Sequence, residues 1–232
     1  MQSLRVLCLI VAASVLSGCP ATSVRTPAPT KEALPEVGAP DVRGATIYTL
    51  NPTSNVAIHV FRGGTLARLG HNHVMTAQQV TGRAWVHSSI ERSGFEASFP
   101  VAQLLVDDPK ARAAAGSEFP GEIPADDREG TRKNMLRAEV LDAEKFPTIS
   151  LRSVKVSGTL PKLQLTARIT IKGVARDVFV PANVAIAGNK LTATGAFDIQ
   201  QTTFGIKPFS IGLGALEVQD KLHIEFELVG DK

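Results

Sequence analysis

The sequence predicts an all-β domain, a barrel or sandwich of antiparallel strands with little helix. The first observation is the alternation of apolar and polar residues along three segments, 163–172, 191–200 and 222–228. Successive side chains of a strand face opposite sides of a sheet, so each segment has one wet face and one dry face, which is typical of antiparallel sheets. The second observation is that turn signals rich in Gly, Pro, Asn and Ser separate the strand-like segments at regular intervals.

The composition is compatible with one such domain and excludes several other classes of protein. The chain has 232 residues, of which 44% are hydrophobic and 20% charged, so it can build a core and is not disordered by composition. Two cysteines cannot supply a disulfide-rich scaffold or a four-cysteine zinc site. The net charge of +3 is small and scattered, which argues against nucleic-acid binding.

Residues 1–18 are predicted to be a secretory signal peptide. Arg5 precedes an apolar run, Val6–Leu16, that is too short to span a bilayer. The run ends in Leu16-Ser17-Gly18-Cys19, which resembles the bacterial lipobox, so Cys19 is the expected lipidation site. Pro20 rather than Asp follows the cysteine, which favours the outer membrane, so we expect an anchored lipoprotein of the cell envelope and periplasm.

Residues 19–43 are predicted to be a disordered tether that follows the lipidated cysteine. Five prolines interrupt this segment and it contains no aromatic residue. Such a stretch cannot bury enough apolar surface to offset the entropy of ordering it. The β domain is therefore expected to occupy residues 44–232.

Further strands are expected within that domain, although some are shorter or less regular. Pro181 falls in one of them and requires a sheet edge or a bulge, because proline has no N–H to donate. These additional candidates are 46–50, 56–61, 80–87, 95–101, 149–156 and 178–186.

Helix is expected in only one or two short stretches. Residues 66–69 and 73–77 could form a turn or two of helix. Residues 128–141 could form a short helix with Asp126 or Asp127 as its N-cap.

An eight-stranded barrel has an interior just wide enough for side chains or for one small ligand. Several residues on the expected dry faces are slim and could leave a cavity: Gly82, Ala84, Ala97, Ala167, Ala193 and Gly195. The alternative is that loops and aromatic side chains fill the barrel.

Three parts of the domain carry distinctive segments. They are Leu69-Gly70-His71-Asn72-His73-Val74-Met75 with Val80-Thr81-Gly82-Arg83-Ala84, then Phe146-Pro147-Thr148-Ile149-Ser150 within 137–153, then Ile171-Lys172-Gly173-Val174 followed by Thr203-Phe204-Gly205-Ile206. Together, these segments resemble the YceI-like family of lipid- and polyisoprenoid-binding periplasmic proteins. The resemblance covers roughly residues 46–229, nearly all of the domain.

The resemblance implies an extended, lipocalin-like antiparallel β-barrel of about eight strands with a long apolar tunnel. It also implies a non-catalytic protein whose ligand is a polyisoprenoid, an isoprenoid quinone or a similar long-chain lipid, with no cofactor. The candidate ligand-contacting residues are Phe61, Leu69, His71, His73, Met75, Trp85, Phe95, Phe99, Phe146, Phe197, Phe204 and Phe209.

Polar residues leave other interpretations open. His71 and His73 could bind a metal with His59 or His87, could form a polar rim near a ligand head group, or could belong to a structural turn. The acidic stretch 107–129 lacks the spacing of a calcium loop and is interpreted as a solvated loop.

Basic residues at helical spacing in 128–137 could meet an anionic head group, but a solvated helix face is the preferred interpretation. Nucleophile-elbow and phosphate-loop motifs are missing from the sequence. Two alternatives to lipid binding therefore remain: a metal-dependent protein built on His71 and His73, and a structural or partner-binding envelope protein with a filled barrel.

Overall fold

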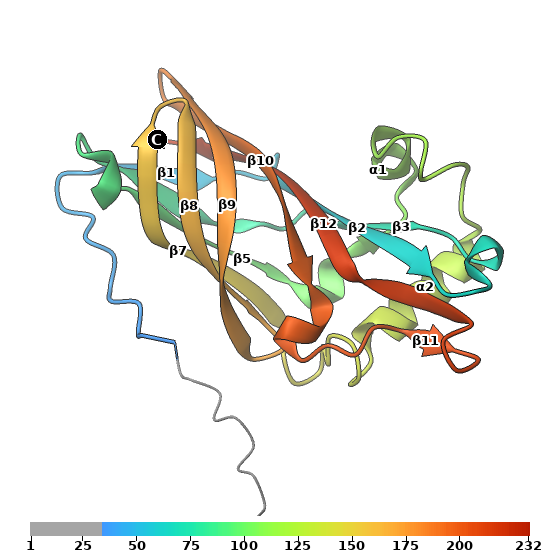
Figure 1. Ribbon diagram of the computed structural model, residues 1–232. Helices are drawn as coiled ribbons and strands as arrows, with labels where there is room; N and C mark the ends of the chain where they lie inside the picture. The colour runs from blue at the N-terminus through green and yellow to red at the C-terminus, as the bar shows by residue number, and fades with distance from the viewer. Residues whose placement is uncertain (1–33) are drawn as a thin grey trace, which may run out of the picture. The chain divides into compact units, whose positions relative to one another are not determined.

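The computed structural model describes residues 34–232 (Figure 1). The predicted signal peptide and Cys19 lie outside the described residues. The strands are β1 (Thr46–Leu50), β2 (Asn55–Gly63), β3 (His73–Ala77), β4 (Thr81–Val86), β5 (Gly94–Pro100), β6 (Leu105–Val106), β7 (Thr148–Thr159), β8 (Lys162–Ile171), β9 (Val174–Ala187), β10 (Lys190–Gln200), β11 (Ser210–Ile211) and β12 (Leu216–Asp231). The helices are α1 (Pro109–Ala114) and α2 (Ala125–Leu136), with short 3-10 turns that include η1 (Ala67–Leu69) and η4 (Gln201–Phe204).

Eight of these strands close into an antiparallel barrel in the order β1-β4-β5-β7-β8-β9-β10-β12. The barrel closes where β12 pairs with β1, with Leu50 opposite Gly230 and Thr49 opposite Asp231. Along each strand of the closed ring, the alternating side chains point in turn into the barrel and out to solvent. The predicted all-β barrel is confirmed.

The long strand β12 also connects the barrel to a small extension. Only its last residues pair with β1, while the stretch from Glu217 to Glu227 pairs with β2. Strands β3 and β6 continue from β2, and β11 pairs with the start of β12. This extension, α1 and α2 lie together at one end of the barrel (Figure 1).

Two segments of the extension differ from the sequence-based expectation. Residues 73–77 form strand β3, so the predicted helical turn there is wrong. The segment shows no alternation because both of its faces are covered: Met75 is buried in the main core, and Val74 and Thr76 are buried on the opposite face. A strand buried on both faces loses the period-two signal.

Helix α2 begins and ends earlier than the predicted 128–141. Its N-cap is Pro124, and Asp126 and Asp127 lie in the first turn, where carboxylates favour the positive end of the helix dipole. The helix ends at Leu136, because Arg137 adopts an extended backbone. Proline is accepted at a helix start, where an N–H would have no partner inside the helix.

Pro181 lies on a stretch of β9 that has no partner strand on one side within the described residues, as the sequence requires for a proline in a strand. Strand β9 pairs with β8 from Val174 to Asn183, but its pairing with β10 covers only Asn183–Ala187. Pro181 therefore lies beyond the paired stretch on the β10 side, where a missing N–H leaves no ladder bond unmade.

Residues 34–43, which the composition assigns to the tether, run along the outside of the barrel. Arg168 donates to the carbonyl of Pro35, and Arg152 donates to the carbonyls of Val37 and Gly38. Further along, the guanidinium of Arg92 donates to the carboxylate of Asp41 at 2.9 Å. The partners of this segment are distant in the sequence, so its composition gives no sign of the contacts. Within residues 34–232, no helix is long and apolar enough to cross a membrane.

Candidate ligand-binding cavity

The barrel encloses a cavity of about 310 Å³. Each of the eight barrel strands contributes at least one lining side chain, and most of these side chains are aliphatic or aromatic. Cavities that bind small ligands are concave and mostly apolar in the same way. Of the two possibilities that the sequence left open, the structure has the one with an internal cavity and not the one with a filled barrel.

Slim residues make this space, as the sequence predicted for four of the six. Ala84, Ala97, Ala167 and Ala193 all line the cavity. The two glycines have another role, because they allow close approach of neighbouring strands. A Cβ at Gly82, whose φ is +146°, would lie 2.1 Å from the carbonyl oxygen of Glu96.

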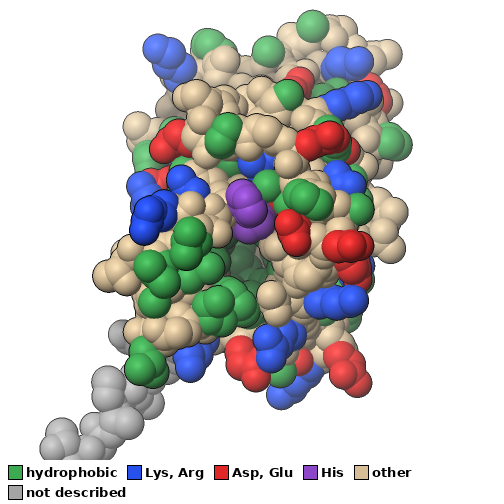
Figure 2. Space-filling model, turned by 90° about the vertical axis from the view of Figure 1, so that its right-hand side faces the viewer, with side chains coloured by type: hydrophobic (Ala, Val, Ile, Leu, Met, Phe, Trp, Pro, Cys, Tyr) green, Lys and Arg blue, Asp and Glu red, His purple; other side chains and the backbone are tan. Residues whose placement is uncertain are grey.

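The molecule is hollowed at the end of the barrel that carries the extension, and hydrophobic side chains gather beside the hollow (Figure 2). Elements at this end carry the lining residues His73 and Phe209. A hydrogen bond of 2.7 Å from the Leu66 N–H to the carbonyl of Ala215 joins the β2–β3 and β11–β12 connections. The exposed large hydrophobic residues on these two connections are Leu66, Leu69, Ile211 and Leu213.

Polar groups are few in the lining. Among the described residues that line the cavity there is no Lys, Arg, Asp or Glu, and the polar side chains are those of His73, Ser93, Thr131, Asn134 and Gln201. Gln201 donates to the carbonyl of Gln219, and the Ser93 hydroxyl accepts from the His87 N–H. The cavity is therefore apolar along the barrel, and three of its five polar side chains, those of His73, Thr131 and Asn134, come from β3 and α2.

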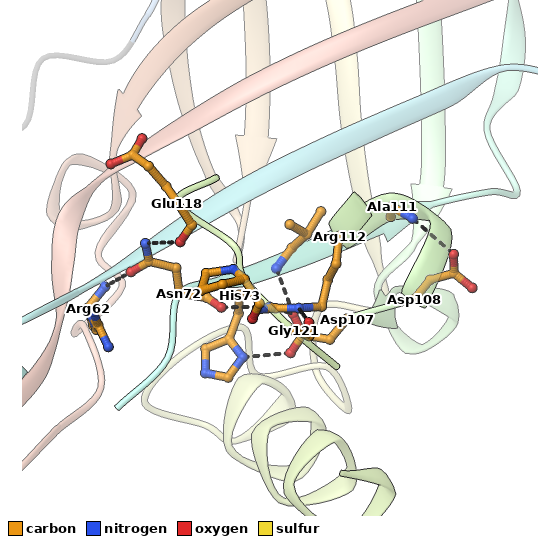
Figure 3. Close-up of polar contacts among 11 residues, drawn as sticks. Arg62, Asn72, His73, Asp107, Asp108, Ala111, Arg112, Glu118 and Gly121 are labelled. Carbon is orange, nitrogen blue, oxygen red and sulfur yellow. Dashed lines mark hydrogen bonds and ion pairs between the residues drawn. The ribbon is translucent and has the colours of Figure 1, made fainter. Parts of the chain in front are cut away.

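His73 is held by a buried carboxylate. Its Nδ1 donates to Oδ2 of Asp107 at 2.6 Å, and the other oxygen of Asp107 accepts from Nη1 of Arg112 at 2.7 Å and from the Val74 N–H at 3.0 Å (Figure 3). The side chain of Asp107 is fully buried and that of Arg112 is 2% exposed. The three side chains form a continuous chain of charge-assisted hydrogen bonds that ends at the cavity.

Arg112 is held in turn by backbone carbonyls. Its guanidinium donates to the carbonyls of Asn72, Pro120 and Gly121 at 2.8–3.0 Å. Helix α1 presents Arg112, and the Asp108 carboxylate caps that helix by accepting from the N–H groups of Lys110 and Ala111. The guanidinium thus fixes the connection between α1 and α2 against β3.

Asp107 is charged in this setting. Burial works to raise its pKa, but hydrogen bonds from His73, the Val74 N–H and Arg112 lower the pKa below its ordinary value. The interpretation of 107–129 as a solvated loop is therefore wrong at the buried Asp107 and at the helical stretches 109–114 and 125–129. Alternation and composition gave no sign of this, because the partners lie on β3 and α1.

Residues 48–230 match the model of the YceI-like domain. The chain belongs to the YceI-like family. The resemblance seen in the sequence is confirmed. No significant match to the chain was found among curated proteins.

Solved structures share the fold of this YceI-like domain. BcnA of Burkholderia cenocepacia superposes with a TM-score of 0.54 at 18% identity, covering 76% of this chain and 95% of BcnA. An engineered variant of the Campylobacter jejuni YceI protein superposes with a TM-score of 0.51 at 12% identity, covering 68% of this chain and 84% of that one. At such low identities, the similarity shows the fold alone.

The YceI-like barrel brings seven of the twelve candidate ligand-contacting residues to the cavity. These seven are His73, Met75, Trp85, Phe95, Phe99, Phe197 and Phe209. Sequence reasoning named aromatic residues and missed the aliphatic majority of the lining, which includes Leu151, Leu165, Ile169 and Leu222. The inward positions of the alternating segments were the signal that could have found them.

The other five candidates lie away from the lining. Phe61 packs against Phe119 with ring centroids 5.6 Å apart, and Phe204 is buried in the core. The ring of Phe146 lies under the ammonium of Lys145. Leu69 and His71 are exposed on the connection between β2 and β3.

The histidines of the YceI-like domain do not gather into one cluster, although His59 also lies near His223, with ring centroids 5.6 Å apart. His59 lies against Phe119, with ring centroids 5.1 Å apart, and His87 donates through Nε2 to the carbonyl of Asp41. His71 and His73 have ring centroids 6.3 Å apart. In the part of the chain that the structure describes, no group of three or more His, Cys, Asp or Glu side chains is placed to hold a metal ion.

Proposed function

We propose that this YceI-like protein binds a long-chain lipid, such as a polyisoprenoid or an isoprenoid quinone, inside its barrel without chemically changing it. The observation that carries the proposal is the cavity of about 310 Å³, whose lining on the eight barrel strands is almost entirely apolar. Burial of each methylene group there would contribute about 0.8 kcal/mol, so a long hydrocarbon chain gains affinity without any reactive group.

The lining also favours binding over catalysis. General acid–base chemistry needs proton donors and acceptors placed around a reacting atom. The described lining instead consists of hydrocarbon surface with a few polar side chains. Such a surface is suited to holding a chain in place.

We also propose that the protein is tethered to the outer membrane through a lipid on Cys19. The support is in the sequence: a basic residue, an apolar run and the segment Leu16-Ser17-Gly18-Cys19. A lipid anchor would keep the barrel close to a source of apolar ligands. Substitution of Cys19 by Ala is expected to move the protein from the membrane fraction to the periplasmic fraction, and a variant that stays with the membrane would contradict the anchor.

Organic extraction of the purified protein, followed by mass spectrometry, tests lipid binding directly. We expect an apolar lipid in the extract, and uptake of an added polyisoprenol by protein from which lipid has been stripped. A clean extract from folded protein that also takes up no polyisoprenol and no neutral fluorescent hydrocarbon probe would overturn the proposal.

A matched pair of variants assigns the lipid to the cavity. Ala193 lines the cavity on β10, and Ala185 on the paired strand β9 is exposed. Ala193→Trp should fill the space and abolish uptake, whereas Ala185→Trp should leave uptake unchanged. Because added volume in a packed core destabilises by about 1–3 kcal/mol, circular dichroism should first show that both variants are folded.

A further inference from the structure

One ring nitrogen of His73 is left for a ligand. Nδ1 donates to the Asp107 carboxylate at 2.6 Å, so this nitrogen carries a proton and is already occupied within the protein. Nε2 has no hydrogen-bond partner among residues 34–232, and it carries the lone pair in the tautomer that this hydrogen bond selects. His73 lines the cavity, and its ring projects from β3 on the side where α2 lies (Figure 3).

Charge at this place is already balanced within the protein. Asp107 and Arg112 form a buried ion pair at 2.7 Å, and three further guanidinium N–H groups donate to backbone carbonyls. Neither member of the pair lines the cavity. The imidazole of His73 is therefore oriented by an ion pair whose two charges cancel. Its Nε2 is left for a ligand, and the pair adds no net charge beside it.

An anionic head group does not match these surroundings. The described lining includes no lysine or arginine, and an unpaired charge is costly to remove from water. Thr131 and Asn134 of α2 line the same cavity and can hydrogen-bond to a neutral polar group. The chemistry that fits is an uncharged head group with an O–H donor.

We propose that Nε2 of His73 accepts a hydrogen bond from the hydroxyl group of an uncharged lipid, a long-chain alcohol or a hydroquinone, whose chain occupies the barrel. This inference rests on the proposed function, because it requires a lipid in the cavity. Asp107 and Arg112 are positioning residues, since they act only through the orientation of the imidazole. The cost of removing two charges from water can cancel the attraction between them, so a buried ion pair need not be present to stabilise the fold. A positioning role gives this pair another function.

A set of ligands that share one hydrocarbon chain and differ in the head group distinguishes lipid binding in the cavity from recognition of a hydroxyl group by His73. Hexadecane, hexadecyl methyl ether, hexadecanol, palmitate and hexadecyl phosphate would each displace a neutral fluorescent hydrocarbon probe from stripped protein. We expect hexadecanol to bind about fivefold more tightly than the ether, the gain of one neutral hydrogen bond, and palmitate and the phosphate to bind no better than the ether.

Two histidine variants assign the preference to Nε2. His73→Phe should bind hexadecanol and the ether equally while it still binds hexadecane. His71→Phe, an exposed neighbour outside the lining, should keep the fivefold preference. Should His73→Phe fail to fold, nitrogen-15 spectra of the wild-type protein give a second measurement, because the Nε2 resonance of His73 should shift with hexadecanol and not with the ether.

Equal binding of hexadecanol and the ether to wild-type protein would overturn the inference. Tighter binding of palmitate or the phosphate, or an unchanged preference in folded His73→Phe, would do the same. In each of these cases hexadecane still displaces the probe and the proposed function stands. If neither the probe nor hexadecane binds, the proposed function itself fails.

Discussion

Asp107 and Arg112 form a salt bridge of 2.7 Å between two side chains that are almost completely removed from solvent. The carboxylate follows β6 and the guanidinium lies on α1, five residues later. Asp107 also has a positive φ of 52°, which few non-glycine residues adopt. The pair therefore fixes both the α1 connection and the imidazole of His73.

Removal of the guanidinium should be strongly destabilising. Arg112→Met leaves Asp107 buried without its cation, and the loss of one partner of a buried pair typically costs about 3–5 kcal/mol. Urea denaturation followed by circular dichroism measures the loss. Arg132→Met, on the half-exposed surface of α2, is the control and should change stability by less than about 1 kcal/mol. A similar small change in Arg112→Met would show that the pair does not stabilise the fold.

Acid should destabilise the protein partly through Asp107. The pKa of this carboxyl is lower in the folded protein than its ordinary value of 3.8, so its contribution is fully present above 3.8. The contribution is lost as the pH falls from 3.8 through the lower folded-state pKa. Urea midpoints measured across this window should fall less steeply in Asp107→Asn than in the wild type. Parallel curves would contradict the assignment.

A second pH dependence is expected from His59. Burial lowers the pKa of this imidazole below 6.5 in the folded protein, with Glu225 opposing and His223 reinforcing the shift. The unfolded chain then binds the proton more readily, so stability is full above pH 6.5 and declines below it. His59→Gln should flatten the urea midpoint between pH 6.5 and the lower folded-state pKa. His71→Gln, at an exposed position, should keep the slope of the wild type.

Glycine at position 82 should be intolerant of a side chain. The φ of +146° and the approach of the Glu96 carbonyl to 2.1 Å from a Cβ leave no room for alanine, so Gly82→Ala should cost at least about 2 kcal/mol. Gly130, inside α2 with open space around it, is the matched control. Gly130→Ala should stabilise by about 0.4–1 kcal/mol in the same thermal or urea unfolding measurement. Equal effects of the two substitutions would contradict the close strand approach at Gly82.

Most of the barrel follows from local sequence. Segments 163–172, 191–200 and 222–228 alternate because each has one wet and one dry face; apart from the turn residue Lys172, all of their residues belong to barrel strands. Residues 73–77 were misassigned because both faces of β3 are covered, one by the core and one by the α1 connection. Alternation of apolar and polar residues appears only when one face of a strand meets water and the other does not. It is therefore absent from a strand with both faces buried.

The candidate site was only partly predictable for a related reason. An inward aromatic residue such as Phe99 can be inferred from alternation and size. Phe61 and Phe204 are equally large and aromatic, yet they pack elsewhere in the fold, Phe61 against Phe119 and Phe204 in the core. The role of His73 depends on Asp107, 34 residues away, and no local pattern relates the two.

The sequence by itself determined the antiparallel β class, the approximate strands, the slim inward positions and the resemblance to the YceI-like family. These properties depend on the alternation of neighbouring residues and on short turn motifs. Tertiary structure decided the ring closure of β1 on β12, the branching of β12 to β2, the shape of the cavity and the chain from Arg112 through Asp107 to His73. These depend on which distant segments share a face of the sheet, and that choice is made by packing and by the pairing of buried charges.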